Sequence, residues 1–286
     1  MKFVPPALGW QRDTPDFRDY TIRHPRVQQT LARLKRPVSG RSRIPLRVDL
    51  REYFSDVEDQ GTLNSSTACA CTALVQYFEQ RAHGRLCEPS KLFLHQMTRK
   101  LGGGFGNTVA DLRTTLQALI HFGVPPEQYW PYDPTRFDDQ PTDPVLFTFG
   151  RQYHAIHHFR LDCANCTGVE TLAAVKSCLS AGFPSVFGFP VPSSLSLDGD
   201  IPYRPTFDSI RGGQAVVAVG YDDRRIRSTK GALLIRNSWG KAWGEAGYGW
   251  VPYAFVESQL AVDFWTLLKQ DWLDSGEFDR PPDLQR

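Results

Sequence analysis

The hydrophobic pattern of this chain changes near its middle, and that change constrains the fold more than any other feature. Between residues 66 and 122, apolar side chains recur at three- and four-residue spacing, which predicts helices over 66–81, 90–101 and 108–122. Beyond residue 150, runs of β-forming residues bounded by turn residues predict strands over 153–160, 184–189, 215–220, 232–236 and 248–251. One helix, over 171–180, interrupts these strands. The first half is therefore predicted to be helical and the second half to consist mainly of strands.

Two motifs far apart in the sequence contain polar residues of the types found in catalytic sites. The first comprises Val48-Asp49-Leu50-Arg51 and then Asp59-Gln60-Gly61-Thr62-Leu63-Asn64-Ser65-Ser66, directly before the predicted helix 66–81. The second comprises Gly212-Gly213-Gln214-Ala215-Val216 and Asn237-Ser238-Trp239-Gly240, followed by Trp243-Gly244 and Gly247-Tyr248. Their order and separation make chance a poor explanation for the two together.

Both motifs resemble those of papain-like cysteine peptidases, and the resemblance covers about residues 47 to 265. It implies an α+β fold of two lobes, one helical and one β-barrel-like, with a cleft between them. Ser66 stands where the family has its nucleophilic cysteine, and Gln214 where it has the catalytic histidine. Gln60 matches the residue whose side chain helps the N–H of residue 66 to bind the oxyanion, and Asn237 matches the residue that orients the histidine.

The residues at the two reactive positions argue against peptide hydrolysis. A serine hydroxyl is far less acidic than a thiol and needs a base to become a nucleophile. Gln214 cannot supply one, because a carboxamide takes no proton near neutral pH. No histidine lies beyond residue 158, where the family's base is expected. Loss of either partner of such a pair typically costs about a million-fold in turnover, and loss of both costs little more.

Ordinary structural roles stay open for each of these residues, since short motifs are weak evidence one at a time. Ser65 or Ser66 could cap the following helix, Gln214 could be a strand residue, and Asn237 could be a buried amide with structural hydrogen bonds. A serine engineered in place of a cysteine would explain Ser66 and leave Gln214 unexplained.

Five further residues are candidates for binding a peptide in the cleft: Gly103, Gly104, Phe105, Gly213 and Trp239. The first three belong to a glycine-rich segment, 102–107. In relatives such a segment lines the cleft and pairs with the substrate backbone, which requires close main-chain approach. A flexible surface loop is the alternative for this segment.

The resemblance and the composition divide the chain into four regions. Residues 1–46 are an extended, basic, propeptide-like arm interrupted by six prolines, in which 26–35 can form a short helix. Its segment from Gly9-Trp10 to Asp19-Tyr20 resembles a stretch ahead of the body in bacterial members of the family, where a leader often covers the cleft. Residues 47–135 are the helical lobe and 136–265 the β-rich lobe. Residues 266–286 are expected to be a loose acidic tail.

His154, His157, Cys163 and Cys166 are weak candidates for a zinc site, because zinc prefers such ligands. Structural zinc sites usually have two ligand pairs, whereas these histidines lie on the predicted strand 153–160, where adjacent side chains face opposite ways. We therefore expect neither a metal nor another cofactor. The six cysteines are expected to be mostly reduced, since the chain is large and shows no signal sequence.

The composition gives no reason to expect a nucleic acid or a membrane as the main partner, so we expect a peptide or a protein. A net charge of +2 gives no case for a nucleic acid or a membrane surface. No stretch approaches the roughly 20 apolar residues of a membrane span. With 286 residues, 41% of them hydrophobic, the chain can form one large core or two smaller cores around a cleft. We expect a cytoplasmic protein.

These observations favour a pseudopeptidase, an inactive relative that binds a peptide or protein or acts as a scaffold. The bound segment would come from a partner or from the chain's own N-terminal arm. One alternative is an unusual peptidase or acyl transferase that uses Ser66 with an unidentified base, such as His24 of the arm. Another is a structural component whose cleft is a relic.

Overall fold

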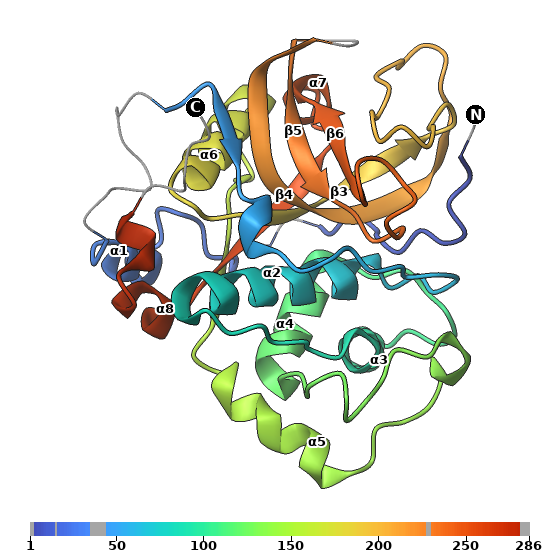
Figure 1. Ribbon diagram of the computed structural model, residues 1–286, viewed down its shortest axis with the longest axis vertical. Helices are drawn as coiled ribbons and strands as arrows, with labels where there is room; N and C mark the ends of the chain where they lie inside the picture. The colour runs from blue at the N-terminus through green and yellow to red at the C-terminus, as the bar shows by residue number, and fades with distance from the viewer. Residues whose placement is uncertain (1–2, 15, 35–43, 227–229, 281–286) are drawn as a thin grey trace.

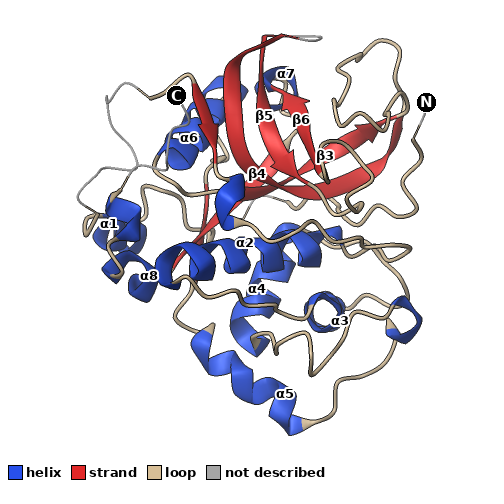
Figure 2. Ribbon diagram, viewed as in Figure 1, coloured by secondary structure: helices blue, strands red, loops and turns tan. Residues whose placement is uncertain are grey.

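The computed structural model describes residues 3–14, 16–34, 44–226 and 230–280. Figures 1 and 2 show most of the helices on one side of the molecule and the strands on the other. The two-lobed α+β fold predicted from the sequence is therefore confirmed. Within the described residues, no helix is long and apolar enough to cross a membrane.

The helical lobe is built around α2 (Ser66–His83), which runs through the middle of the molecule (Figure 1). Below it lie α3 (Lys91–Gly102), α4 (Leu112–Phe122) and the short α5 (Pro144–Thr148). The third helix begins four residues later than predicted because the side chain of Asp111 caps it, accepting from the N–H of Thr114. The lobe continues past residue 135, since Phe147 of α5 packs against Phe93 of α3.

The second lobe is a coiled, fully antiparallel sheet. Its strands follow the order β2-β7-β3-β4-β5-β6, and β1 also pairs with the long β4. The prediction missed β7 and placed the start of β2 too early. The strands are β1 (Arg47–Asp49), β2 (His157–Arg160), β3 (Ser185–Pro192), β4 (Ile210–Ile226), β5 (Lys230–Arg236), β6 (Tyr248–Pro252) and β7 (Val262–Leu268).

Four further helices lie around the sheet and at the two ends of the chain. A capping box between Thr167 and Glu170 starts α6 (Gly168–Ser180), which packs near α7 (Tyr253–Glu257). In the arm, α1 (Pro25–Leu31) begins one residue before the expected helical stretch 26–35 and overlaps its first half. The remaining helix, α8 (Gln270–Asp274), belongs to the C-terminal segment.

The loose acidic tail expected over 266–286 is wrong for the part that the structure describes. β7 extends to residue 268, and α8 and a 3-10 turn follow it. Trp272 and Phe278 are buried, and the ring of Trp272 stacks on Phe78 of α2 at 4.7 Å. Two aromatic anchors outweigh the acidic composition of this segment, because each buries a large apolar area.

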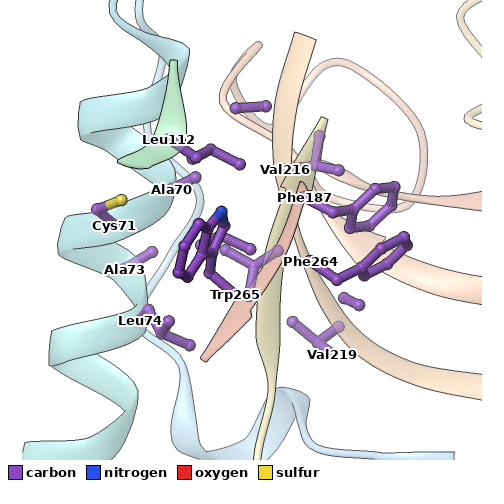
Figure 3. Packing of buried hydrophobic residues seen from close by; sticks show 14 of the residues in the cluster. Ala70, Cys71, Ala73, Leu74, Leu112, Phe187, Val216, Val219, Phe264 and Trp265 are labelled. Atoms are coloured by element: carbon purple, nitrogen blue, oxygen red, sulfur yellow. The ribbon is translucent and has the colours of Figure 1, made fainter. Parts of the chain in front are cut away.

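Buried side chains join α2 to the sheet, and Figure 3 shows this interface. Trp265 of β7 is fully buried and lies between the helix and the strands. This packing fixes the N-terminal end of α2 against β4. The labelled residues are Ala70, Cys71, Ala73 and Leu74 of α2, Leu112 of α4, and Phe187, Val216, Val219, Phe264 and Trp265 of the sheet.

Candidate functional site

The fold brings together the four residues that the sequence singles out for catalytic positions. Gln60 precedes α2, Ser66 is the first residue of α2, Gln214 lies on β4, and Asn237 follows β5. All four are buried. The side-chain Nε2 of Gln214 donates to Oε1 of Gln60 at 2.9 Å and to Oδ1 of Asn237 at 3.0 Å. The hydroxyl of Ser66 accepts from the N–H of Ala215 at 3.2 Å.

Ser238 completes this group, although the sequence analysis gave it no role. Its hydroxyl donates to Oε1 of Gln60 at 2.6 Å, and its N–H donates to Oδ1 of Asn237 at 2.8 Å. Its carbonyl accepts from the N–H of Gln60 at 2.8 Å. The only sequence signal was its place directly after Asn237. The resulting amide and hydroxyl network ties the loop before α2 to the sheet.

The network contains hydrogen-bond donors where a hydrolase would need a proton acceptor. Gln214 directs its NH₂ group at Asn237 and Gln60, and its Oε1 is buried without a partner among the described residues. A carboxamide nitrogen has no basic lone pair. No histidine takes part in the hydrogen bonds described for Ser66 or Gln214. His24, the candidate base from the arm, stacks on Tyr20 and caps α1.

The nearest thiol offers no replacement nucleophile. Cys69 lies one turn after Ser65 on α2 and is buried, and its Sγ is 3.8 Å from the hydroxyl of Ser65. Burial raises the pKa of the Cys69 thiol to about 12, so the thiolate is scarce at neutral pH.

Ser65 occupies the N-cap position of α2 without making a capping hydrogen bond. Its hydroxyl instead pairs with the hydroxyl of Tyr132 at 2.7 Å. Tyr132 in turn donates to the carbonyl of Gln60 at 2.8 Å, and burial raises the pKa of Tyr132 well above its usual range. These bonds hold the loop 60–65 in place, so the neutral tyrosine positions the start of α2.

The N-terminal arm crosses this group of residues as an extended segment. Trp10 donates its N–H to the carbonyl of Gly213 at 3.0 Å, and the carbonyl of Gly9 accepts from the N–H of Ala110 at 3.0 Å. Gln11 donates its N–H to the carbonyl of Ala110 at 3.0 Å. The arm thus makes main-chain hydrogen bonds to both lobes at once.

Close packing accompanies these main-chain bonds. A Cβ built on Gly9 would lie 2.5 Å from the carbonyl oxygen of Asn64 and 2.6 Å from the nitrogen of Ser66. A Cβ on Gly188 or on Gly213 would overlap the indole of Trp10. Trp10 is 7% exposed. We call the surface that receives Gly9 and Trp10 the arm groove; it consists of Asn64, Ser66 and Ala110 on the helical side and Gly188 and Gly213 on the sheet side.

The first residues of the arm continue beyond the arm groove. Leu8 donates its N–H to Oδ1 of Asn64 at 3.3 Å. Phe3 donates its N–H to the carbonyl of Leu195 at 3.0 Å, and its ring lies 5.4 Å from that of Trp239. Of the five peptide-binding candidates, Gly213 and Trp239 therefore contact the arm.

The other three candidates lie at a turn where no described hydrogen bond joins them to the arm. Gly103 ends α3 in a left-handed conformation, and Gly104 donates its N–H to the carbonyl of Arg99. Phe105 is 89% exposed. Ala110, eight residues beyond the end of α3, pairs with the arm instead. The glycine-rich segment 102–107 therefore forms a turn. The main-chain contacts with the arm are made by Ala110, which no sequence motif singled out.

The proposed zinc ligands are not free to bind a metal together. Cys163 and Cys166 form a disulfide, which removes both thiolates and contradicts the expectation that these two thiols are reduced. Among the described residues, no group of three or more metal-binding side chains occurs. Cys69, Cys71, Cys87 and Cys178 are free thiols.

Comparison with known proteins agrees with this architecture. Residues 44–259 match the model of the papain family of cysteine proteases, and the chain belongs to that family. An uncharacterized peptidase C1-like protein, L477, of Acanthamoeba polyphaga mimivirus is 31% identical over 277 residues, which span 91% of this chain and 86% of the viral protein. A cathepsin L-like proteinase of Fasciola hepatica is 26% identical over 216 residues, spanning 72% of this chain and 59% of that protein.

Two solved structures show the same fold. Xylellain, a cysteine protease from Xylella fastidiosa, is 31% identical with a TM-score of 0.74, over 94% of this chain and 98% of xylellain. Procathepsin B from Trypanosoma congolense is 17% identical with a TM-score of 0.64, over 92% of this chain and 86% of the other. The second likeness supports the fold alone.

Proposed function

We propose that this chain is a non-catalytic member of the papain family that holds an extended peptide segment between its lobes. The observation that carries the proposal is the hydrogen bond from Gln214 Nε2 to Asn237 Oδ1. Where a peptidase of this family needs a base beside its asparagine, this chain has a donor that takes no proton near neutral pH. Ser66, without a base, is a poor nucleophile.

The resident segment in this proposal is the chain's own arm. It supplies main-chain hydrogen bonds to Ala110 and Gly213, as an added strand does when it pairs with an exposed edge. Gly9 covers the nitrogen of Ser66, which in an active relative would be free to bind an oxyanion. The arm therefore occupies the position that a bound peptide would take.

The arm groove also specifies the chemistry of its occupant. The position beside Ser66 has room for glycine alone, because a Cβ there would lie 2.6 Å or less from backbone atoms of Asn64 and Ser66. The next position takes a large flat side chain, because Gly188 and Gly213 leave space for an indole. We propose that a partner peptide competes with the arm through a glycine followed by an aromatic residue.

The alternative of a Ser66-dependent peptidase or acyl transferase has less support. The hydroxyl of Ser66 accepts a main-chain hydrogen bond from Ala215, and its described contacts include no base. The alternative of a relic structural component predicts that the arm groove tolerates any substitution. Its close fit to Gly9 and Trp10 argues against that view.

The test is peptide binding to the full chain carrying Trp10→Ala, which weakens the arm as a competitor. A fluorescent peptide with the sequence of residues 4–12 should bind this variant, and a version with alanine at the Gly9 position should bind at least tenfold more weakly. The wild-type chain should bind the first peptide more weakly than the variant does, because the tethered arm competes. Equal binding of the two peptides, or no binding to the variant, would refute the proposal.

A further inference from the structure

A buried charge cluster joins the arm to the body just beyond the arm groove. Two of its carboxylates come from the arm, and the other groups come from α4, β2, β7 and the loop after β2. We call it the arm latch. It consists of Asp13 and Asp19 of the arm, Arg113 of α4, Arg160 of β2, Asp162, and Asp263 of β7.

Arg160 lies at the centre of the latch and bridges the arm to β7. Its Nη1 donates to Oδ1 of Asp13 at 2.9 Å, and its Nη2 donates to Oδ1 of Asp263 at 2.9 Å. The N–H of Asp13 also donates to Oδ2 of Asp263 at 3.2 Å. The side chains of Asp13 and Asp263 are 3% and 1% exposed, so both carboxyl groups lie beside Arg160 almost without water.

The remaining groups complete the charge balance. Arg113 forms a two-bond ion pair with Asp19, and Arg160 forms one with Asp162. Asp162 also accepts the N–H groups of Asp263 and Phe264. Four carboxyl groups therefore face two guanidinium groups, and the cluster would carry two negative charges if every acid were ionised.

An unpartnered oxygen indicates that one carboxyl group of the latch holds a proton. Oδ2 of Asp13 is buried and has no donor among the described residues, although a carboxylate oxygen in that position needs one. A proton between Asp13 and Asp263 would give Oδ2 of Asp13 a hydrogen-bond donor and would relieve the repulsion between the two acids.

We propose that Asp13 and Asp263 share a proton that fastens the arm in its groove, and that loss of this proton releases the arm. This inference rests on the proposed function, in which the arm is the resident occupant of the arm groove. It adds a regulator of that occupancy: the proton concentration sets how readily a partner peptide can replace the arm.

The direction of the pH effect follows from the environment of Asp263. Burial first, and then the charge and hydrogen bond of Asp13, raise the pKa of Asp263 to about 8 from an ordinary 3.8. When the arm leaves, Asp13 leaves with it, and the pKa of Asp263 falls toward its ordinary value. The docked state then binds more protons than the released state between these two pH values. Docking is strongest at low pH and weakens by at most about tenfold per pH unit as the pH rises through 8.

One histidine and the two arginines beside the latch keep the same charge state across that window. Burial lowers the pKa of His158, which faces Asp19 and Arg113, to about 4, so its imidazole stays neutral. Burial lowers and Asp162 raises the pKa of Arg160, with a net rise, and Asp19 raises that of Arg113, so both guanidinium groups stay charged. Burial raises the pKa of Asp162, while the guanidinium of Arg160 and the N–H of Asp263 act against this rise.

The test is amide hydrogen exchange of residues 3–12 in the full chain at pH 6, 7 and 8, corrected for the intrinsic pH dependence of exchange. In the wild type, protection of the Trp10 and Gln11 N–H groups should fall severalfold or more from pH 6 to pH 8. In Asp13→Asn it should stay high and flat, because the amide NH₂ takes the place of Oδ2, which accepts no described hydrogen bond, and donates permanently to Asp263. The control Asp16→Asn changes a partly buried arm carboxylate that pairs with Arg18 outside the latch, and should keep the wild-type slope.

Each result has a definite meaning. A flat wild-type profile, a sloping Asp13→Asn profile, or an Asp13→Asn arm that is unprotected at every pH would overturn the latch. Absence of protection at Trp10 in the wild type at pH 6 would instead overturn the arm as resident occupant, and with it the proposed function.

Discussion

Trp10→Ala should release the arm from the body, and the structure sets the size of the effect. The indole is 7% exposed and lies on Gly188 and Gly213. A buried tryptophan contributes roughly 150–250 Å² of buried area, and its replacement by alanine typically costs about 3–5 kcal/mol. We take the lower end, because Nε1 of Trp10 has no partner among the described residues. About 3 kcal/mol corresponds to a roughly 100-fold larger released population.

Tryptic cleavage after Arg12 measures that population. The N–H groups of Gln11 and Asp13, on either side, are bonded to Ala110 and Asp263, so a protease reaches this peptide bond only when the arm leaves. Where opening is fast relative to cleavage, the cleavage rate follows the open population. Initial rates, read by mass spectrometry, should therefore rise about 100-fold in the variant.

Phe17→Ala is the matched control for this prediction. Phe17 is an aromatic residue of the same arm, and it is fully exposed. Its removal should leave the cleavage rate after Arg12 within about twofold of the wild type. Equal rates for Trp10→Ala and the wild type would show that the indole does not hold the arm, and the reasoning about the arm groove would fail.

Three further predictions concern the amide network and the cysteines. Gln214→Ala should lower the free energy of unfolding by about 1–3 kcal/mol, seen as a lower urea midpoint, because it removes the donor shared by Gln60 and Asn237; an unchanged midpoint would contradict the network. A chain that carries Trp10→Ala, Ser66→Cys and Gln214→His should have a thiol at residue 66 that iodoacetamide alkylates faster at pH 6 than the thiol of the chain that carries Trp10→Ala and Ser66→Cys only. The reason is that an imidazolium stabilises a thiolate. Equal rates would show that Asn237 does not orient the new histidine. Denatured, unreduced protein should expose four thiols, and six after reduction; six thiols without reduction would contradict the disulfide.

The fold was predictable because its local and long-range signals agree. The helix from Ser66 carries an apolar repeat and a left-handed glycine at its end, and the structure places it within two residues of the prediction. The strand β7 was not predicted because Asp263, a residue type depleted in strands, interrupts its run of β-forming residues. The structure of the C-terminal segment was not predicted because its acidic composition suggested a loose tail. Two buried aromatic residues, Trp272 and Phe278, fix its position instead.

The candidate site was predictable in its residue types and less so in its contacts. Sequence motifs brought Gln60, Gln214 and Asn237 to notice, and their hydrogen bonds join them in the structure. Ala110 and Gly188 contact the arm because the main chains of segments far apart in the sequence approach each other closely. Spacing within one segment carries no information about such approach. The same is true of the arm latch, whose six charged residues come from four separate segments of the sequence.

The central claim is that this chain binds peptide without cleaving it. The most direct measurement incubates the full chain carrying Trp10→Ala with a proteome-derived peptide pool, and compares the new peptide termini by mass spectrometry with those from the same chain carrying Ser66→Ala as well. The account predicts identical sets of termini, with peptides that contain glycine followed by an aromatic residue retained by both proteins. Termini that appear only when Ser66 is present would show a working nucleophile and contradict the account.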